Sequence, residues 1–159
     1  MLTKLRSHWW GNALFLALMT APVYIPFVLR LTYYRDDWYY AYDGLVGPSG
    51  VFRTMFASDR PLRGWFFEVY LYVFGISPFP YHLGMYFWRL AGGLGVTWLV
   101  IQLWPRHWQA AFISGLLYAI YPGFTWWVGG LEYQPMAASA ALMVFSFGFT
   151  YQGLRASRT

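Results

Sequence analysis

The chain lacks cysteine altogether, which excludes disulfides and thiolate metal sites and leaves the redox compartment open. It is also poor in charge. Only 11% of its 159 residues are Asp, Glu, Lys or Arg, whereas soluble domains usually carry about 25%. At the same time, 58% of the residues are hydrophobic. These proportions predict an integral membrane protein.

Acidic residues are the scarcer charged type, with six carboxylates against eleven Lys and Arg. The basic residues are scattered around the apolar segments rather than gathered in a stripe, which argues against nucleic-acid binding. They are better explained as topology signals and contacts to anionic lipid headgroups. All six acids fall on one side of the predicted membrane: Asp36, Asp37, Asp43, Asp59, Glu68 and Glu132.

Four apolar segments are long enough to cross about 30 Å of hydrocarbon as helices. They cover residues 11–29, 82–104, 108–127 and 131–151. The expected fold class is therefore all-α, a polytopic membrane bundle of about four transmembrane helices. The first segment exceeds the roughly 7 to 15 apolar residues of a signal peptide, and no A-x-A-type site follows it, so we expect an uncleaved span.

Short helices are expected between the first and second spans. The length of the apolar stretch 64–77 suits an interfacial or re-entrant helix better than a span. If this stretch did span, the tail with Arg155 and Arg158 would lie outside. Ser58 or Asp59 is expected to cap it, with Pro61 in its first turn. A short amphipathic helix is expected over 51–57, and another before the glycine-rich break that precedes it.

Orientation follows from the basic residues in the short flanks, which favour the cytoplasmic side. We expect both termini to be cytoplasmic, in the cytoplasmic (inner) membrane, and the loop 30–80 to be extracytoplasmic. The residues that support this orientation are Lys4, Arg6, Arg106, Arg155 and Arg158.

The first candidate for chemistry is the adjacent pair Asp36-Asp37, flanked by tyrosines and a tryptophan. Two carboxylates at a membrane surface can act as a general base or bind a cation. If residues 30–42 continue as a helix, neighbouring positions diverge by about 100°, so the two acids are expected to point to different places. The alternative is a solvated loop start, with the acids paired to Arg35 inside an interfacial aromatic belt.

A second candidate is the run from Ser58 to Arg63. Arg60 and Arg63 lie three residues apart and would share a helix face, where forked guanidinium donors can grip a phosphate. The alternative assigns the arginines to lipid headgroups and Asp59 to a helix cap.

A third set lies on the second span and at the last outer turn. His82 and Arg89 are seven residues apart, on one helix face and about 10 Å from each other. An arginine at this depth needs a partner, an outer acid or a phosphate, unless it snorkels to the interface. For His82 the alternative is an ordinary interfacial hydrogen bond. Glu132 and Gln134 occupy the turn before the fourth span and can overlie the same cavity.

The order of these features resembles the N-terminal part of the GT-C superfamily, the multi-span glycosyltransferases that use polyprenyl-phosphate-linked sugars. The resemblance is carried by a basic N-terminus before the first span, the Asp36-Asp37 pair, Asp59-Arg60-Pro61-Leu62 before the second span, and the Tyr121-Pro122-Gly123-Phe124 turn. It covers nearly all of residues 1–159, read as a single membrane domain, and implies the first third or so of such an enzyme.

The resemblance implies a sugar transfer from a polyprenyl-phosphate donor to a glycan or lipid acceptor. Asp36 or Asp37, with Asp36 favoured, would accept the proton of the acceptor hydroxyl. Arginines would stabilise the lipid phosphate, and a divalent cation (Mg, Mn or Ca) could bind at Asp37 or Asp59. The side chains expected to bind substrate are Asp59, Arg60, Arg63, His82, Arg89, Glu132 and Gln134.

Two other functions compete with this one. A non-catalytic membrane subunit would pack against a larger membrane complex through the small residues of its second and fourth spans. A pigment- or cofactor-binding subunit would use His82 as an axial ligand. The small residues are Gly92, Gly93, Gly95, Ala137, Ala138, Ala140 and Ala141.

Overall fold

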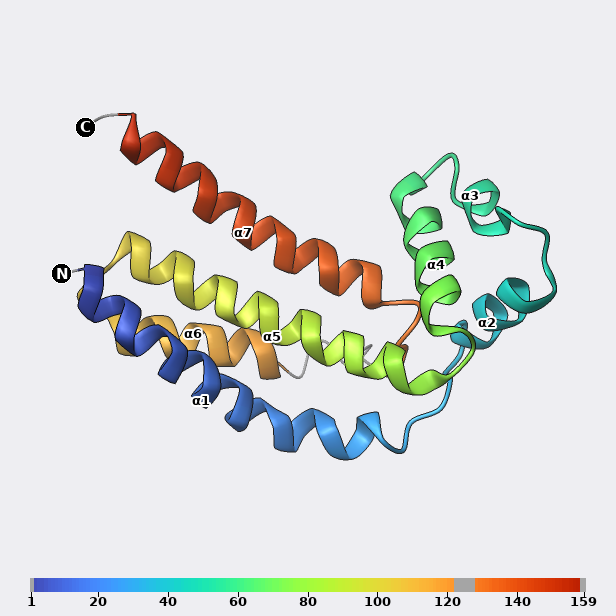
Figure 1. Cartoon of the computed structure of the whole chain (residues 1–159), viewed down its shortest axis with the longest axis horizontal. Coiled ribbons are helices and arrows are strands. Elements are labelled where there is room, and N and C mark those ends of the chain that lie inside the picture. The colour runs from blue at the N-terminus through green and yellow to red at the C-terminus, as the bar shows by residue number, and fades with distance from the viewer. Residues whose placement is uncertain (1, 122–127, 158–159) are drawn as a thin grey trace.

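A computed structural model describes residues 2–121 and 128–157 of the chain, with side chains from Trp10 onward. Within these ranges the protein forms seven α-helices and no strand, which confirms the all-α prediction. Four long helices make an elongated bundle, and three short helices gather at one end of it (Figure 1). Helix α1 begins and helix α7 ends at the opposite end.

The bundle is organised around α5, which packs against each of the other long helices. The long helices are α1 (Leu2–Val28), α5 (Pro78–Leu103), α6 (Trp108–Ile120) and α7 (Gln134–Ala156). They coincide in order and place with the four predicted segments.

One described helix is long and apolar enough to cross a membrane by length and composition alone, over Trp10–Val28. Helix α6 is apolar but has only 13 described residues. Helices α5 and α7 are long enough, but polar residues such as His82, Arg89 and Gln134 lower their hydropathy. The predicted extension of the third segment to Trp127 lies outside the described residues, as do Arg158 and the side chains of Lys4 and Arg6.

Two predicted helix starts are wrong. Helix α5 begins at Pro78 rather than at His82, because a proline is tolerated in the first turn of a helix. Helix α7 begins at Gln134 rather than at Leu131, because the preceding residues form a turn whose backbone contacts another part of the chain. Pro135 lies in the first turn of α7, where its missing N–H costs no hydrogen bond.

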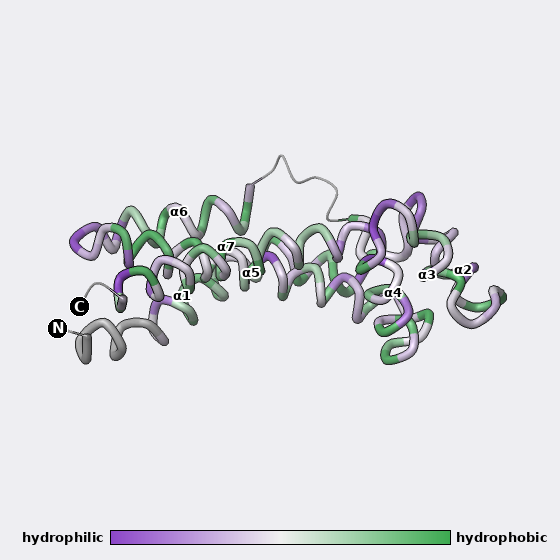
Figure 2. The backbone as a smooth tube through the Cα atoms, turned by 90° about the horizontal axis from the view of Figure 1, so that it is seen from above, coloured by the Kyte–Doolittle hydropathy of each residue, from purple (hydrophilic) through white to green (hydrophobic). Residues whose placement is uncertain are grey.

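The short helices are α2 (Asp37–Val46), α3 (Val51–Met55) and α4 (Pro61–Phe74). They enclose a small core made chiefly of aromatic rings. This core joins the short helices to the first turn of α5 and to the turn before α7. Figure 2 shows the hydrophilic segments chiefly at the two ends of the molecule. The buried members of this core are Tyr33, Ala41, Phe52, Phe56, Phe67, Tyr81 and Leu131.

The expected short helix 64–77 exists as the 14-residue α4, with Pro61 in its first turn as predicted. The expected cap is wrong. Arg60 is the residue at the N-cap, and the helix has no side-chain cap. The Asp59 carboxylate accepts a hydrogen bond from Arg60 Nε at 2.8 Å instead of one from the helix backbone. The Asp59 carboxylate therefore binds the side chain of Arg60 in place of the helix N-terminus.

Glycines let α5 and α6 approach each other closely. A Cβ placed on Gly93 would lie 2.7 Å from the backbone oxygen of Gly115, and Gly92 faces the ring of Tyr118. Gly95 faces Val144 of α7 in the same way. The small residues on α5 therefore serve packing within this chain.

Candidate functional site

The acid pair lies at a sharp turn that starts α2. Arg35 adopts a left-handed conformation with φ of 51°, which is uncommon for a residue with a side chain. The Asp37 N–H then donates to the Tyr34 carbonyl at 3.1 Å and closes the turn. Asp36 is exposed and Asp37 is fully buried. The two acids thus point to different places, as adjacent positions predict.

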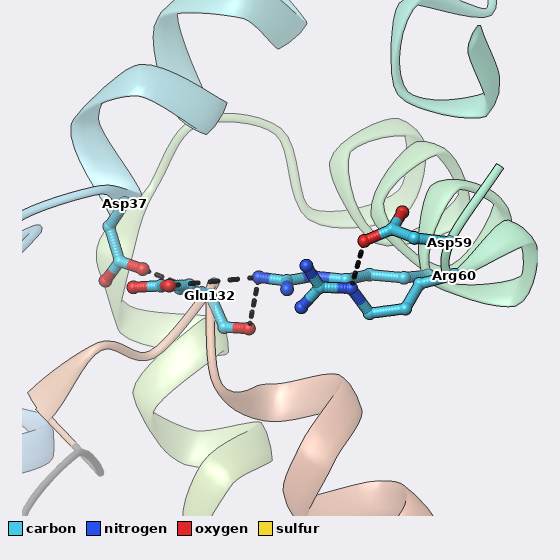
Figure 3. Close-up of polar contacts among 5 residues, drawn as sticks. Asp37, Asp59, Arg60 and Glu132 are labelled. Carbon is cyan, nitrogen blue, oxygen red and sulfur yellow. Dashed lines mark hydrogen bonds and ion pairs between the residues drawn. The ribbon is translucent and has the colours of Figure 1, made fainter. Parts of the chain in front are cut away.

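The Asp37 carboxylate binds the backbone of the turn before α7. Its Oδ1 accepts a hydrogen bond from the Glu132 N–H at 2.7 Å (Figure 3). Its Oδ2 is buried and has no hydrogen-bond partner among the described residues. Burial raises the pKa of Asp37, and the N–H groups of Glu132 and Leu131 oppose that rise.

Glu132 brings a second carboxylate to this place from far along the chain. Burial raises its pKa, the nearby Asp36 carboxylate raises it further, and Arg63 lowers it. Arg63 Nη2 donates to the Glu132 carbonyl at 3.1 Å and lies 3.9 Å from Glu132 Oε1. The turn is therefore held by Asp37 from one side and by Arg63 from the other.

Arg63 and Arg60 have different environments. The Arg63 guanidinium is buried against aromatic rings, with the centroids of Phe56 at 4.8 Å and Phe67 at 5.2 Å. Arg60 is exposed and pairs with Asp59, a hydrogen bond that lowers the pKa of the Asp59 carboxyl (Figure 3). Arg63 is thus built into the core, and Arg60 faces solvent.

His82 and Gln134 lie beside the same turn. His82 is buried, and its Nε2 is 3.1 Å from the Thr32 carbonyl. Gln134 is fully buried, and its Nε2 donates to the Tyr81 carbonyl at 3.3 Å. Their remaining polar atoms, His82 Nδ1 and Gln134 Oε1, are buried without a hydrogen-bond partner in the described part of the chain.

Arg89 lies deeper in the bundle, among α1, α5 and α6. Its Nε donates to the Tyr24 hydroxyl at 3.4 Å, and its guanidinium lies 5.8 Å from the centroid of the Tyr118 ring. Glu68, another acid expected as a partner of Arg89, forms an ion pair with Arg53 at 2.9 Å.

The two residues expected as ligands of a divalent cation, Asp37 and Asp59, do not lie together. Figure 3 places Asp37 and Asp59 on opposite sides of Glu132, and each carboxylate has its own hydrogen-bond donor. Over residues 2–121 and 128–157, no three His, Asp or Glu side chains are grouped so that they could hold a metal ion.

A hollow of about 520 Å³ lies between the α2–α3 loop and α4. Trp65, Glu68 and Tyr72 of α4 line it. The carboxylates of Asp36, Asp37 and Glu132 lie elsewhere, so this hollow is distinct from the acid-rich site.

The structure thus brings Asp36, Asp37, Arg63 and Glu132 together, with His82 and Gln134 beside them. It leaves Asp59 and Arg60 on the surface and Arg89 inside the bundle. The left-handed backbone of Arg35 carries no signal in the sequence. Tyr133 lies in the same turn as Glu132 and Gln134, and burial raises its pKa, with a further rise from the carboxylates of Glu132 and Asp36.

No protein-family model, no curated protein and no solved structure matches the chain. One exposed carboxylate lies beside a buried one, with a buried guanidinium and a third acid next to them. Such an arrangement can take up a proton from a hydroxyl at the surface and hold its own geometry while it does so.

Proposed function

We propose that the protein is a GT-C-type glycosyltransferase module, which transfers a sugar from a polyprenyl phosphate to an acceptor hydroxyl at the outer face of the cytoplasmic membrane. The observation that carries the proposal is the exposed Asp36 beside the buried, anchored Asp37. This pair lies at the end of the bundle opposite the start of α1 and the end of α7 (Figure 1).

In this proposal α1, α5, α6 and α7 cross the membrane. The apolar stretch Trp10–Val28 supports the first crossing. The first crossing packs against the third, since the Tyr24 hydroxyl donates to the Ala119 carbonyl at 2.6 Å. An even number of crossings agrees with the start of α1 and the end of α7 at one end of the bundle. The short helices then lie at the outer surface.

Asp36 acts as the general base. The acceptor oxygen forms a bond to the anomeric carbon, the bond from that carbon to the phosphate oxygen breaks, and the phosphate keeps the electron pair. Asp36 takes the hydroxyl proton as the bond forms, and the configuration at the anomeric carbon inverts. The exposed Arg60 is suited to the negative charge that develops on the leaving phosphate, since its guanidinium is accessible at the surface.

The test is transfer of radiolabelled sugar from polyprenyl-phosphate hexoses to lipid or glycan in membranes that contain the protein. We expect labelled product from the wild type and none from Asp36→Asn, with equal insertion of both. Equal product from the two proteins would rule out the proposed base.

A second candidate is a non-catalytic membrane subunit, which the apolar outer face of α7 favours. Leu142, Met143 and Phe147 are exposed on this face, where they can contact lipid or a partner helix. In that case Asp36→Asn would leave the assembly and activity of the complex intact. The substitution Phe147→Ser would release the protein from its partner.

A further inference from the structure

We propose that Asp37 is a positioning residue: its buried carboxylate clamps the turn before α7 and thereby holds Glu132 and Arg63 beside Asp36. This inference rests on the proposed function, because it assigns to Asp36 the proton transfer. The clamp itself is a structural claim that can be tested without any activity.

The first support is the contact between Asp37 and the turn. Asp37 is 0% exposed, and its Oδ1 accepts a hydrogen bond from the Glu132 N–H at 2.7 Å across 95 residues of sequence. A hydrogen bond to a charged acceptor is among the stronger kinds in proteins. The Glu132 N–H precedes the first helical residue of α7 and has no helical partner of its own.

The second support is what the turn carries. Leu131 is fully buried in the aromatic core of the short helices. Glu132 receives Arg63 Nη2 on its carbonyl at 3.1 Å. A displacement of this turn therefore changes the contact with Arg63 and moves the Glu132 carboxyl, which lies near Asp36.

The third support is the backbone before the acid pair. The left-handed Arg35 reverses the chain, so that Asp37 turns into the protein and Asp36 stays outside. Residues in such sparsely populated conformations concentrate at functional sites, where the surrounding structure holds them in place. The clamp by Asp37 supplies that hold at this turn.

Burial also separates the two acids by role. An acceptor hydroxyl can reach the exposed Asp36, whereas Asp37 has no accessible surface and one of its oxygens is occupied by the Glu132 N–H. A positioning role needs an oxygen that accepts this hydrogen bond and does not need a proton acceptor in solution. Asparagine keeps such an oxygen, and alanine does not.

The experiment compares Asp37→Asn with Asp37→Ala in the full protein, with two readouts. The first is hydrogen exchange of the Glu132 N–H in detergent or nanodisc. We expect strong protection in the wild type, similar protection in D37N, and exchange faster by about tenfold or more in D37A, as expected when a hydrogen bond to a charged group is lost. Unchanged protection in D37A would overturn the clamp.

The second readout is kcat for sugar transfer from a polyprenyl-phosphate hexose. We expect D37N to recover most of the kcat that D37A loses, since the asparagine oxygen can still accept the Glu132 N–H. If D37N is as inactive as D36N while its turn stays protected, Asp37 is itself the catalytic residue and the inference is wrong. D37N decides this point even where D37A does not fold.

The two claims fail in different ways. Full transfer by D36N would refute the proposed function, yet the exchange of the Glu132 N–H would still report on the clamp. Loss of transfer in D36N, combined with unchanged protection in D37A, would refute the clamp and leave the proposed function standing.

Discussion

The hydroxyl of Tyr24 in α1 donates a hydrogen bond to the Ala119 carbonyl in α6 at 2.6 Å and also accepts one from Arg89 Nε. Tyr24 is 3% exposed, so this contact lies inside the bundle. It joins the first long helix to the third and receives a buried cation at the same point.

Replacement of Tyr24 by phenylalanine removes the hydroxyl and keeps the ring. We expect a loss of about 1–3 kcal/mol in the free energy of unfolding, because two buried polar groups lose a partner. Thermal or denaturant unfolding in detergent measures this loss. The matched control is Tyr39→Phe, at a tyrosine that is 70% exposed, which should change little. Equal effects of the two changes would contradict the account of this contact.

The close approach of α5 and α6 predicts that Gly93→Val is destabilising. The first added carbon lies 2.7 Å from the Gly115 backbone oxygen, and overpacking of this kind typically costs about 1–3 kcal/mol. Gly153→Ala is the control, because no atom lies within 4 Å of an added Cβ there and alanine favours the helix. A Gly93 variant as stable as this control would show that the helices do not pack as described.

The two arginines of the Asp59–Arg63 run should differ in their contribution to stability. Arg63→Met removes a cation that binds the Glu132 carbonyl and lies over buried rings, so we expect a loss of about 2 kcal/mol. Arg60→Met removes an exposed ion pair with Asp59 and a contact over the Phe56 ring at 5.9 Å, which contribute little at the surface. Unfolding of both variants in the same detergent compares them, and a reversed order would contradict the described environments.

Stability should depend on pH through the buried acids. Burial raises the pKa of Asp37 above its ordinary 3.8 and that of Glu132 above its ordinary 4.5. Below these ordinary values the two carboxyls are protonated in both the folded and the unfolded state, so folding does not bury a charged carboxylate. As pH rises through the window above them, the unfolded state loses protons that the folded state keeps, so stability falls.

The measurement is the unfolding temperature in one detergent at several pH values from about 4 to about 7. We expect it to fall as pH rises in the wild type, and to fall less in Asp37→Asn, which has no proton to lose at that position. An unfolding temperature that rises with pH over this window in the wild type, and rises less in Asp37→Asn, would contradict the burial of Asp37.

Much of the helical framework could be predicted from the length of the apolar stretches and from the prolines that begin helices. The long apolar stretch 11–29 predicted α1, and the short stretch after Pro61 predicted α4. Local signals sufficed because length, proline position and hydropathy act on the segment that contains them. The fourth segment was expected from Leu131, but α7 begins at Gln134, because the Glu132 N–H is bound by Asp37.

The site was predictable only in part. The acid pair and its divergence follow from adjacency, but the burial of Asp37 depends on a turn that lies 95 residues away in sequence. Arg60 and Arg63 were expected to share a helix face that binds phosphate. Their spacing gave no sign that Arg63 would bury its charge among aromatic rings. Single-sequence reasoning has no access to such contacts, because no local pattern records which distant backbone group a side chain will meet.

The most direct test of the central claim is the initial rate of sugar transfer from a polyprenyl-phosphate hexose, measured for the wild type, Asp36→Asn and Asp43→Asn at equal protein in membranes. Asp43 lies on the same helix, α2, and controls for the loss of a carboxylate. The account predicts that Asp36→Asn lowers the rate by about 10² to 10⁴-fold, the usual contribution of a general base, and that Asp43→Asn stays near the wild type. Transfer at the wild-type rate by Asp36→Asn would contradict it.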